Sequence, residues 1–210
     1  MKDLILIGAG AFGREILNWL PNCIGYNKDF CFKGFIDNQM DRLAPYKMDD
    51  EIIALIKDYV PQENDYFLCT VADLNYRRKY VKLIEEKGGK FITIIHKTCE
   101  VSIRSDMGKG IFVAPFSTIS CDTVIGNHVL FNSYGAIGHD VTIEDFCHIG
   151  SFILLGGRSI IKTGTTIHPQ SVILPSVKVG KNVVVGAGSI VIKSVKPNQT
   201  VFGAPAKKIL

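Results

Sequence analysis

The sequence has no closely spaced pair of cysteines, although it contains six cysteines. Zinc knuckles and thiol redox motifs are built on C-x-x-C pairs, so neither kind of site is expected here. We expect reduced and mostly buried thiols at the six positions, which are Cys23, Cys31, Cys69, Cys99, Cys121 and Cys147.

The sequence also lacks a concentrated run of positive charge. Its 24 basic and 20 acidic residues give a net charge of +4 and are mixed along the chain. A protein that binds nucleic acid by neutralising phosphates needs a basic patch or stripe. Nucleic acid is therefore not an expected partner.

No long hydrophobic run is present either. The opening "MKDLILIGAG" is apolar for only a few residues before Gly8, too short for the core of a secretory signal, and no other stretch approaches a membrane span. We expect a cytoplasmic protein without a membrane span. With 210 residues, 47% of them hydrophobic, the chain can form one large globular domain or two small ones.

What the sequence does contain is a hydrophobic repeat with a period of six. The stretch "ISCDTVIGNHVLFNSYGAIGHDVTIEDFCHIG", residues 119–150, has an apolar residue at every sixth position, which fits neither an α-helix nor a single strand. The register continues in both directions without an insertion. It comprises seventeen positions: Ile95, Val101, Met107, Val113, Ile119, Ile125, Phe131, Ile137, Ile143, Ile149, Leu155, Ile161, Ile167, Ile173, Val179, Val185 and Val191.

A second column, rich in small and β-branched residues, follows four residues after these positions. These side chains can also point inward, and they are Ser117, Thr123, Val129, Gly135, Val141, Cys147, Ile153, Ser159, Thr165, Ser171, Val177, Val183 and Ser189.

Glycine often directly follows the apolar position, at Gly108, Gly126, Gly138, Gly150, Gly156, Gly180 and Gly186. This placement suits a corner where backbone angles are unusual or where side chains would crowd. Each hexad is then a short strand plus a turn. Repeated hexads of this kind predict a parallel β-helix, a solenoid in which each coil packs on the next.

Individual hexads, "IGNHVL", "IGHDVT" and "VGAGSI", resemble the hexapeptide repeats of the left-handed β-helix acyltransferases. The left-handed sense comes from this resemblance, because the general crossover rule favours the right-handed one. The resemblance implies three hexads per coil, so that residues eighteen apart stack. It also implies a homotrimer that binds acetyl-CoA as co-substrate in clefts between neighbouring helices.

The first ninety residues have a different pattern. The segment "LILIGAGAFGREILNWL" is an apolar strand that runs into Gly8, Gly10 and Gly13 and then into a helical pattern, and Asp37 closes the next apolar run, "FKGFID". A G-x-G-x-x-G in this context predicts a dinucleotide site, with helix amides on the phosphates and the acid on a ribose hydroxyl. The motif is moderately specific.

The pattern continues with a helix near 49–59, a strand at 65–71, a helix at 74–88 and a strand at 90–95. We therefore expect a small Rossmann-like sheet of about four strands, fewer than the roughly six of a full dinucleotide domain. The predicted fold is this α/β domain at 1–92, a left-handed β-helix at 93–195 and a C-terminal tail at 196–210.

This combination resembles the sugar acetyltransferases of the sialic-acid O-acetyltransferase and bacillosamine-pathway N-acetyltransferase family. The segment "GAGAFGREI" is similar to the family's opening, with Phe12 in place of a common histidine, and Asp73 and Asn75 keep their places in a looser match at "VADLNYRRK". The resemblance implies that Gly8, Gly10, Gly13, Asp37, Asp73 and Asn75 bind a nucleotide-sugar substrate, with UDP as the expected nucleotide.

Acetyl transfer needs a base for the acceptor's proton and hydrogen-bond donors for the oxyanion. Of the five histidines, His139 stands third in the hexad "IGHDVT", where the family has its catalytic histidine followed by an acid. The resemblance therefore implies that His139 is the general base. Asp140, where many relatives have glutamate, would orient it.

The same resemblance assigns further residues. His148 and Gly157 match positions near the acetyl group, and Asn132 matches an asparagine near the sugar. The ending "VFGAPAKKIL" is similar to the family's closing segment near the coenzyme, which would involve Lys207 and Lys208. The eighteen-residue spacing predicts that Cys121, His139 and Gly157 form one column.

The expected function is N-acetylation of a nucleotide-linked amino sugar in bacterial surface-glycan biosynthesis, and three alternatives stand beside it. The nearest is O-acetylation of sialic acid or another sugar. An alternative of another class takes the glycine motif literally, as an NAD-binding oxidoreductase or sensor on a trimeric scaffold. A β-helix carbonic anhydrase is disfavoured because the histidine spacings do not reproduce its zinc ligands, so no metal is expected.

Overall fold

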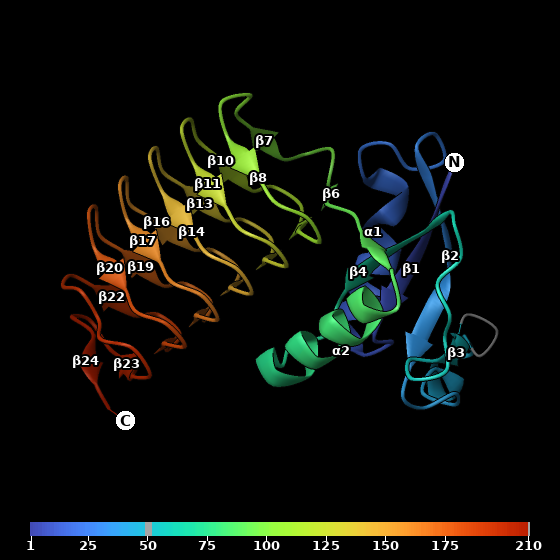
Figure 1. The fold of residues 1–210 in the computed structure, drawn as a ribbon. Helices are drawn as coiled ribbons and strands as arrows, with labels where there is room; N and C mark the ends of the chain where they lie inside the picture. Colours follow the sequence, from blue (N-terminus) through green and yellow to red (C-terminus); the bar gives the residue numbers. More distant parts are fainter. Residues whose placement is uncertain (49–51, 210) are drawn as a thin grey trace. The chain divides into compact units, whose positions relative to one another are not determined.

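The computed structural model describes residues 1–48 and 52–209 and divides the chain into two units, Met1–Ile94 and Ile95–Leu210 (Figure 1). The N-terminal unit combines a parallel sheet with two α-helices, and the C-terminal unit is a solenoid of short strands. Each unit has its own buried hydrophobic residues.

The N-terminal unit contains a five-stranded parallel sheet with the strand order β3-β2-β1-β4-β5. Its central strand is buried on both faces, as expected of a parallel sheet covered by helices, and Leu4 to Ile7 are fully inaccessible. The elements are β1 Lys2–Ile7, α1 Ala11–Trp19, β2 Phe30–Asp37, β3 Ile52–Leu55, β4 Asp65–Cys69, α2 Leu74–Glu86 and β5 Lys90–Phe91, with short 3₁₀ turns at Leu20–Asn22 and Ala44–Tyr46.

The helix predicted near 49–59 is wrong. Ile52–Leu55 forms the edge strand β3, in which Ile52 pairs with Phe35 of β2, while residues 49–51 lie outside the described part of the chain. The physical reason lies in the isoleucine pair: Ile52 is buried and Ile53 is exposed, which is the alternation of a strand. Two effects outweigh the helical pattern of this segment: its pairing with β2 and the preference of its β-branched side chains for strands. The sheet therefore has five strands instead of four.

The C-terminal unit is a left-handed β-solenoid, as predicted. Each of the seventeen predicted apolar positions is the second residue of a two-residue strand. These strands are β6 Ile94–Ile95, β7 Glu100–Val101, β8 Asp106–Met107, β9 Phe112–Val113, β10 Thr118–Ile119, β11 Val124–Ile125, β12 Leu130–Phe131, β13 Ala136–Ile137, β14 Thr142–Ile143, β15 His148–Ile149, β16 Leu154–Leu155, β17 Ile160–Ile161, β18 Thr166–Ile167, β19 Val172–Ile173, β20 Lys178–Val179, β21 Val184–Val185 and β22 Ile190–Val191.

Three parallel sheets run along the solenoid, and Figure 1 shows their strands stacked coil upon coil. The first sheet contains β6, β9, β12, β15, β18 and β21, followed by β23 Thr200–Phe202 and the antiparallel β24 Lys207–Lys208. The second sheet runs from β7 to β22 and the third from β8 to β20. Ile119 pairs with Ile137 and Ile137 with Leu155, so one coil takes eighteen residues.

The solenoid core consists of the two predicted columns. From Val113 onward every apolar position of the first column is buried, and so is every residue of the second. Polar members of the second column bond to backbone oxygens: the Thr123 hydroxyl donates to the carbonyl of Gly138 and that of Thr165 to Gly180. The prediction that both columns point inward is confirmed.

The backbone angles at the corners decide between two explanations for the glycines, an unusual backbone angle and crowding of side chains. Left-handed φ angles occur three residues after the apolar position, for example at Asp122 and Tyr134, and not at the seven predicted glycines. Those glycines lie where coils approach closely: a Cβ on Gly138 would be 2.8 Å from the backbone nitrogen of Gly157. Crowding, rather than an unusual backbone angle, explains the glycines.

Ion pairs also join residues of neighbouring coils. Glu144 accepts from Lys162 Nζ (2.5 Å) and from the backbone N–H and hydroxyl of Thr163. Burial alone would raise the pKa of Glu144, but these hydrogen bonds outweigh it and lower the pKa to about 2. The carboxylate is therefore ionised at neutral pH and links its coil to the next.

Two glycine substitutions are expected to have opposite effects on stability. A Cβ on Gly156 would lie 2.5 Å from the nitrogen of Pro175, so Gly156→Ala should destabilise the chain by about 1–3 kcal/mol because backbone must move. A Cβ on Gly135 would meet no atom nearer than Ser117 Oγ, at 3.5 Å, so Gly135→Ala should stabilise the fold by up to about 1 kcal/mol because alanine lowers the conformational entropy of the unfolded chain. Urea unfolding followed by circular dichroism measures both, and equal effects would contradict the crowding argument.

Candidate functional site

A histidine–carboxylate pair stands at the corner between the second and third sheets, directly after β13. His139 Nδ1 lies 2.7 Å from Asp140 Oδ2, and about half of each side chain is exposed. Because a carboxylate can only accept, Nδ1 carries the hydrogen in this pair, which leaves Nε2 as the basic nitrogen. The pair therefore has the arrangement of a general base with an orienting acid.

Gly157 lies against the His139 ring. A Cβ on Gly157 would be 2.7 Å from Nε2 of His139, so any side chain there would push the ring aside. Within residues 1–48 and 52–209, the Gly157 N–H has no hydrogen-bond acceptor, while its carbonyl accepts from Ser176 N. A free donor thus lies beside the basic nitrogen.

The predicted column of three residues is present in the solenoid. The carbonyl of Cys121 accepts from the N–H of Asp140, and the carbonyl of His139 accepts from the N–H of Arg158. These bonds stack Cys121, His139 and Gly157 on successive coils. The three predicted residues are brought together by the eighteen-residue period.

Arg158 belongs to this corner but was missed in the sequence. Its Nε lies 3.9 Å from Asp140 Oδ2, and its side chain is largely exposed. The signal that could have found it is the same period, because Arg158 comes eighteen residues after Asp140. It supplies a positive charge beside the His139–Asp140 pair.

Asn132 and His148 form a second group. His148 begins β15 and its Nε2 lies 3.3 Å from Oδ1 of Asn132, which directly follows β12. His148 lies in the first sheet, and Asn132 lies at the corner between the first and second sheets. His139 lies beyond the second sheet, so strand β13 separates the two groups within a coil.

Lys207 and Lys208 lie in a third place. They form β24, which pairs with β23 in the order β24-β23-β21-β18-β15, and both side chains are exposed. The strands β23, β21 and β18 therefore stand between them and His148. The two lysines are at the C-terminal end of the solenoid and do not contact His139 or Asp140.

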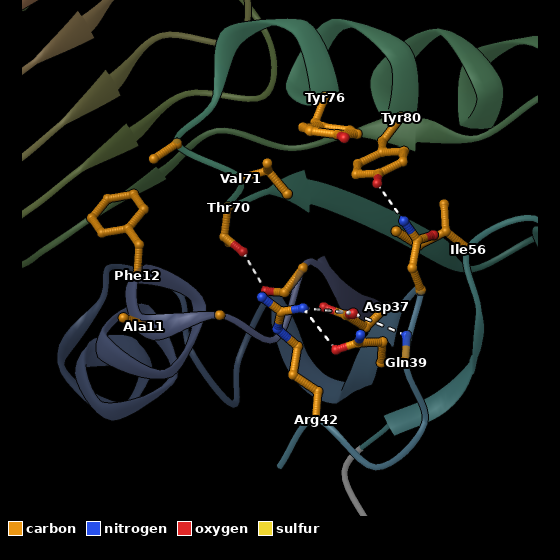
Figure 2. A pocket seen from close by; sticks show the side chains of 14 residues that line it. Ala11, Phe12, Asp37, Gln39, Arg42, Ile56, Thr70, Val71, Tyr76 and Tyr80 are labelled. Carbon is orange, nitrogen blue, oxygen red and sulfur yellow. Dashed lines mark hydrogen bonds and ion pairs between the residues drawn. The ribbon is translucent and has the colours of Figure 1, made fainter.

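A pocket of about 560 Å³ opens in the N-terminal unit at the carboxyl ends of β1, β2 and β4 (Figure 2). This end of a parallel sheet is where ligands bind in open α/β folds. Figure 2 shows the glycine loop and Arg42 on one side and the rings of Tyr76 and Tyr80 on the other. The lining residues are Gly8, Gly10, Ala11, Phe12, Asp37, Asn38, Gln39, Arg42, Ile56, Thr70, Val71, Ala72, Tyr76 and Tyr80.

The three glycines of the motif have different roles in this loop. Gly8 has a left-handed φ of +102°, and a Cβ on Gly13 would lie 2.2 Å from the carbonyl oxygen of Gly8. The first glycine therefore makes the turn and the third lets α1 pack against β1. Around Gly10, which precedes α1, there is open space on the pocket side.

Asp37 is buried and already engaged. Its Oδ2 accepts from Ala9 N (2.7 Å), its Oδ1 accepts from Gln39 N (3.1 Å), and Arg42 Nη1 lies 3.6 Å from Oδ1. The carboxylate braces the glycine loop against the end of β2. A ribose diol that donated hydrogen bonds to Asp37 would have to share the two carboxylate oxygens with these donors.

Asp73 and Asn75 lie outside the pocket lining. Asp73 is the N-cap of α2, where its Oδ1 accepts from Asn75 N (2.9 Å) and Tyr76 N (3.0 Å). Asn75 is exposed. Asp73 therefore positions the start of α2, from which Tyr76 reaches the pocket.

Aromatic and amide side chains that the motif did not indicate line the pocket. Tyr76 and Tyr80 stack with centroids 5.9 Å apart, and the Asn38 amide donates to the hydroxyl of Tyr80. Burial raises the pKa of Tyr80, which keeps the hydroxyl protonated at neutral pH. Aromatic rings beside an oriented amide are suited to a flat, hydrogen-bonding ring such as a nucleobase.

Among residues 1–48 and 52–209, no three or more His, Cys, Asp or Glu side chains are grouped so that they could hold a metal ion. No helix in the same part of the chain has the length and apolar character needed to cross a membrane.

Comparison with known proteins identifies similar sequences. Residues 158–193 match the family described as bacterial transferase hexapeptide (six repeats). Over 187 residues, 87% of this chain, the sequence is 29% identical to GDP-perosamine N-acetyltransferase of Escherichia coli, of which 82% is covered.

Comparison with solved structures identifies the same fold over nearly the whole chain. A mutant perosamine N-acetyltransferase from Caulobacter crescentus, in complex with CoA and GDP-perosamine, superposes with a TM-score of 0.89 at 20% identity and covers 99% of this chain and 97% of its own. The acetyltransferase domain of PglB from Neisseria gonorrhoeae, in complex with acetyl coenzyme A, has a TM-score of 0.88 at 22% identity and covers 99% of both chains.

Replacing Asp37 by asparagine tests its bracing role. An amide has one acceptor oxygen, so Asp37→Asn leaves either Ala9 N or Gln39 N without its partner and should cost about 1–3 kcal/mol of unfolding free energy. The matched control is Asp41→Asn, an exposed neighbour, expected to change stability by less than about 0.5 kcal/mol. Urea unfolding of both variants provides the comparison, and a neutral Asp37→Asn would refute the role.

Proposed function

We propose that this chain, a hexapeptide-repeat acetyltransferase related to the perosamine and bacillosamine-pathway N-acetyltransferases, transfers an acetyl group from acetyl-CoA to the amino group of a nucleotide-linked amino sugar. The observation that carries the proposal is the His139–Asp140 pair with the free N–H of Gly157 beside it. The product would serve bacterial surface-glycan biosynthesis.

The chemistry follows from these three groups. The amine nitrogen attacks the thioester carbon while Nε2 of His139 takes a proton from the amine, and Asp140 holds the Nδ1–H of the resulting imidazolium. The N–H of Gly157 donates to the oxyanion of the tetrahedral intermediate. The carbon–sulfur bond then breaks, the amide forms, and the CoA thiolate takes up the proton.

The N-terminal unit is proposed as a Rossmann-like domain that holds the nucleotide. Its parallel sheet, its glycine loop before α1 and the pocket with Tyr76, Tyr80 and Asn38 support this role. The engagement of Asp37 by Ala9 disfavours NAD, because the acid of a NAD site must be available to a ribose diol. UDP is the nucleotide expected from the sequence, whereas one similar protein is named for GDP-perosamine and one similar structure is a complex with GDP-perosamine, so both nucleotides belong in the test.

The site is proposed to be completed between copies in a homotrimer. Asn132 and His148 lie at one end of the second sheet and His139 at the other, so one chain does not bring both groups to a single substrate. A neighbouring copy that presents Asn132 and His148 to His139 solves this problem. Acetyl-CoA would lie between copies, with Lys207 and Lys208 of the C-terminal tail near its phosphates, and a cytoplasmic location would give access to both substrates.

His139→Asn tests the catalytic assignment. Asparagine retains some hydrogen bonding but cannot accept the proton, so kcat should fall about 10²- to 10⁴-fold while KM for both substrates changes little. Release of the CoA thiol, with GDP- and UDP-linked amino sugars as acceptors, provides the measurement.

The matched control for this variant is His168→Asn, which removes an exposed histidine of the same solenoid outside the His139 corner. It should retain wild-type kcat. Near-normal turnover of His139→Asn, with both substrates saturating, would overturn the catalytic assignment.

Ligand binding separates the proposal from its two alternatives. A ligand that binds only the folded state raises the melting temperature, so acetyl-CoA and either GDP or UDP should each stabilise the protein while NAD does not. A nucleotide-sugar enzyme should also be inhibited by its nucleoside diphosphate, which a free-sugar O-acetyltransferase would tolerate. Stabilisation by NAD alone would refute the proposal, and turnover without nucleotide inhibition would favour O-acetylation.

A further inference from the structure

One wall of the pocket in the N-terminal unit is a segment that contains no strand or α-helix. Residues 38–48, which we call the wall segment, follow β2, and Asn38, Gln39 and Arg42 of this segment line the pocket (Figure 2). All three side chains are exposed rather than held in a core. The opposite wall is part of the helix α2. The position of the first wall therefore depends on the contacts that hold the wall segment itself.

The wall segment is linked internally from Arg42 to Tyr46. Arg42 Nη1 donates to Gln39 Oε1 (3.2 Å), which joins two of the lining side chains. Leu43, the next residue, is fully buried, and its carbonyl accepts from the N–H of Tyr46 (2.8 Å). The 3₁₀ turn that ends at Tyr46 is thereby joined to the residue that adjoins Arg42. The place of the Tyr46 ring and the place of the lining side chains are therefore connected.

The Tyr46 ring is in turn held by Arg14. The guanidinium carbon of Arg14 lies over this ring, 3.5 Å from its centroid, and Tyr46 is 51% exposed. A guanidinium at this distance over an aromatic face makes a cation–π contact and stacks on the ring through its flat group. Because a half-exposed tyrosine has little core packing to fix it, this contact defines where the ring lies.

Arg14 belongs to the helix that follows the glycine loop. It stands one turn into α1, and its backbone N–H donates to the carbonyl of Gly10 (3.0 Å). The N-terminal amides of such a helix are the expected ligands of a diphosphate. The Arg14 side chain itself lies outside the pocket lining, so its influence on the pocket is indirect. The Arg14–Tyr46 contact thus joins the phosphate side of the pocket to the wall segment.

We infer that Arg14 is a positioning residue for the nucleotide pocket, because by stacking on Tyr46 it fixes the wall segment. The inference rests on the proposed function, which assigns this pocket to the nucleotide. A wall that is already in place need not be ordered when the ligand binds, and preorganisation of this kind raises affinity. The segment "GAGAFGREI" then uses its arginine as well as its glycines to build the pocket.

The strength of the contact limits the size of the effect. A cation–π contact at an exposed site corresponds to about a two- to fivefold change in an equilibrium constant. A contact that acts by positioning can change the affinity by no more than its own contribution. A residue that bonds the phosphates directly should have a larger effect, because hydrogen bonds between ionised groups are stronger. The size of the effect therefore separates a positioning residue from a direct ligand.

Substitution of either partner tests the inference. Arg14→Met keeps the apolar stem and removes the guanidinium, and Tyr46→Leu removes the ring. Each variant should raise the dissociation constant for GDP or UDP, whichever binds the wild type, about two- to fivefold in isothermal titration calorimetry of the full chain. The double variant should bind no more weakly than either single variant, because both substitutions remove the same contact.

Steady-state kinetics gives a readout that general damage to the fold would not reproduce. In both single variants the KM for the nucleotide-linked amino sugar should rise by the same factor as the dissociation constant. Because the contact affects only the nucleotide pocket, kcat and the KM for acetyl-CoA should keep their wild-type values.

Two further variants are matched controls. Tyr46→Phe keeps the ring face and should bind the nucleotide like the wild type. Lys28→Met removes one positive charge, as Arg14→Met does, but Lys28 is exposed and precedes β2, at the end of that strand opposite the pocket. It should also bind like the wild type. Circular dichroism and melting temperature of all variants should show that they are folded.

The outcomes separate this inference from the proposed function. Unchanged nucleotide affinity in both Arg14→Met and Tyr46→Leu would overturn the inference and leave the function standing. A loss in Arg14→Met far beyond that in Tyr46→Leu would also overturn it, because Arg14 would then contact the ligand directly. Nucleotide binding that weakens as expected in both variants, without acetyl transfer by the wild type to any nucleotide-linked amino sugar, would overturn the function and leave the inference.

Discussion

Parallel backbone pairing between residues eighteen apart determines everything else in the solenoid. Each strand bonds to the same strand of the preceding and following coil, as Ile119, Ile137 and Leu155 do in the second sheet. Equivalent side chains of successive coils are thereby brought next to one another. A residue's neighbours are then given by its number plus or minus eighteen, so the chain can build a site by placing suitable residues at that spacing.

The three corners of the coil use this rule for different purposes. One corner stacks Cys121, His139 and Gly157 and places Arg158 beside Asp140, which concentrates polar and charged groups. Another stacks Phe116, Tyr134 and Phe152 into an apolar ladder. The third links coils through Glu144 and Lys162. The same backbone conformation therefore carries polar, aromatic or charged side chains, depending only on the residues at its corners.

The parts of the structure that depend on this period could be predicted from the sequence, and the parts that depend on tertiary pairing could not. The hydrophobic columns and the His139–Gly157 contact follow from counting in eighteens. Ile52–Leu55 became a strand because β2 offered a pairing edge, which no local pattern reveals. The bracing role of Asp37 depends on Ala9, which is 28 residues away in the sequence.

Catalysis and assembly are coupled in the proposed enzyme because the second sheet separates the two halves of its site. The general base and the oxyanion donor are held within one chain by coil stacking, so their geometry does not depend on association. The Asn132–His148 pair is equally fixed within its own chain. What association in the proposed homotrimer would add is their relative position. Acetyl transfer would depend on that relative position, because misplacement by about 1 Å can cost on the order of 10²-fold in rate.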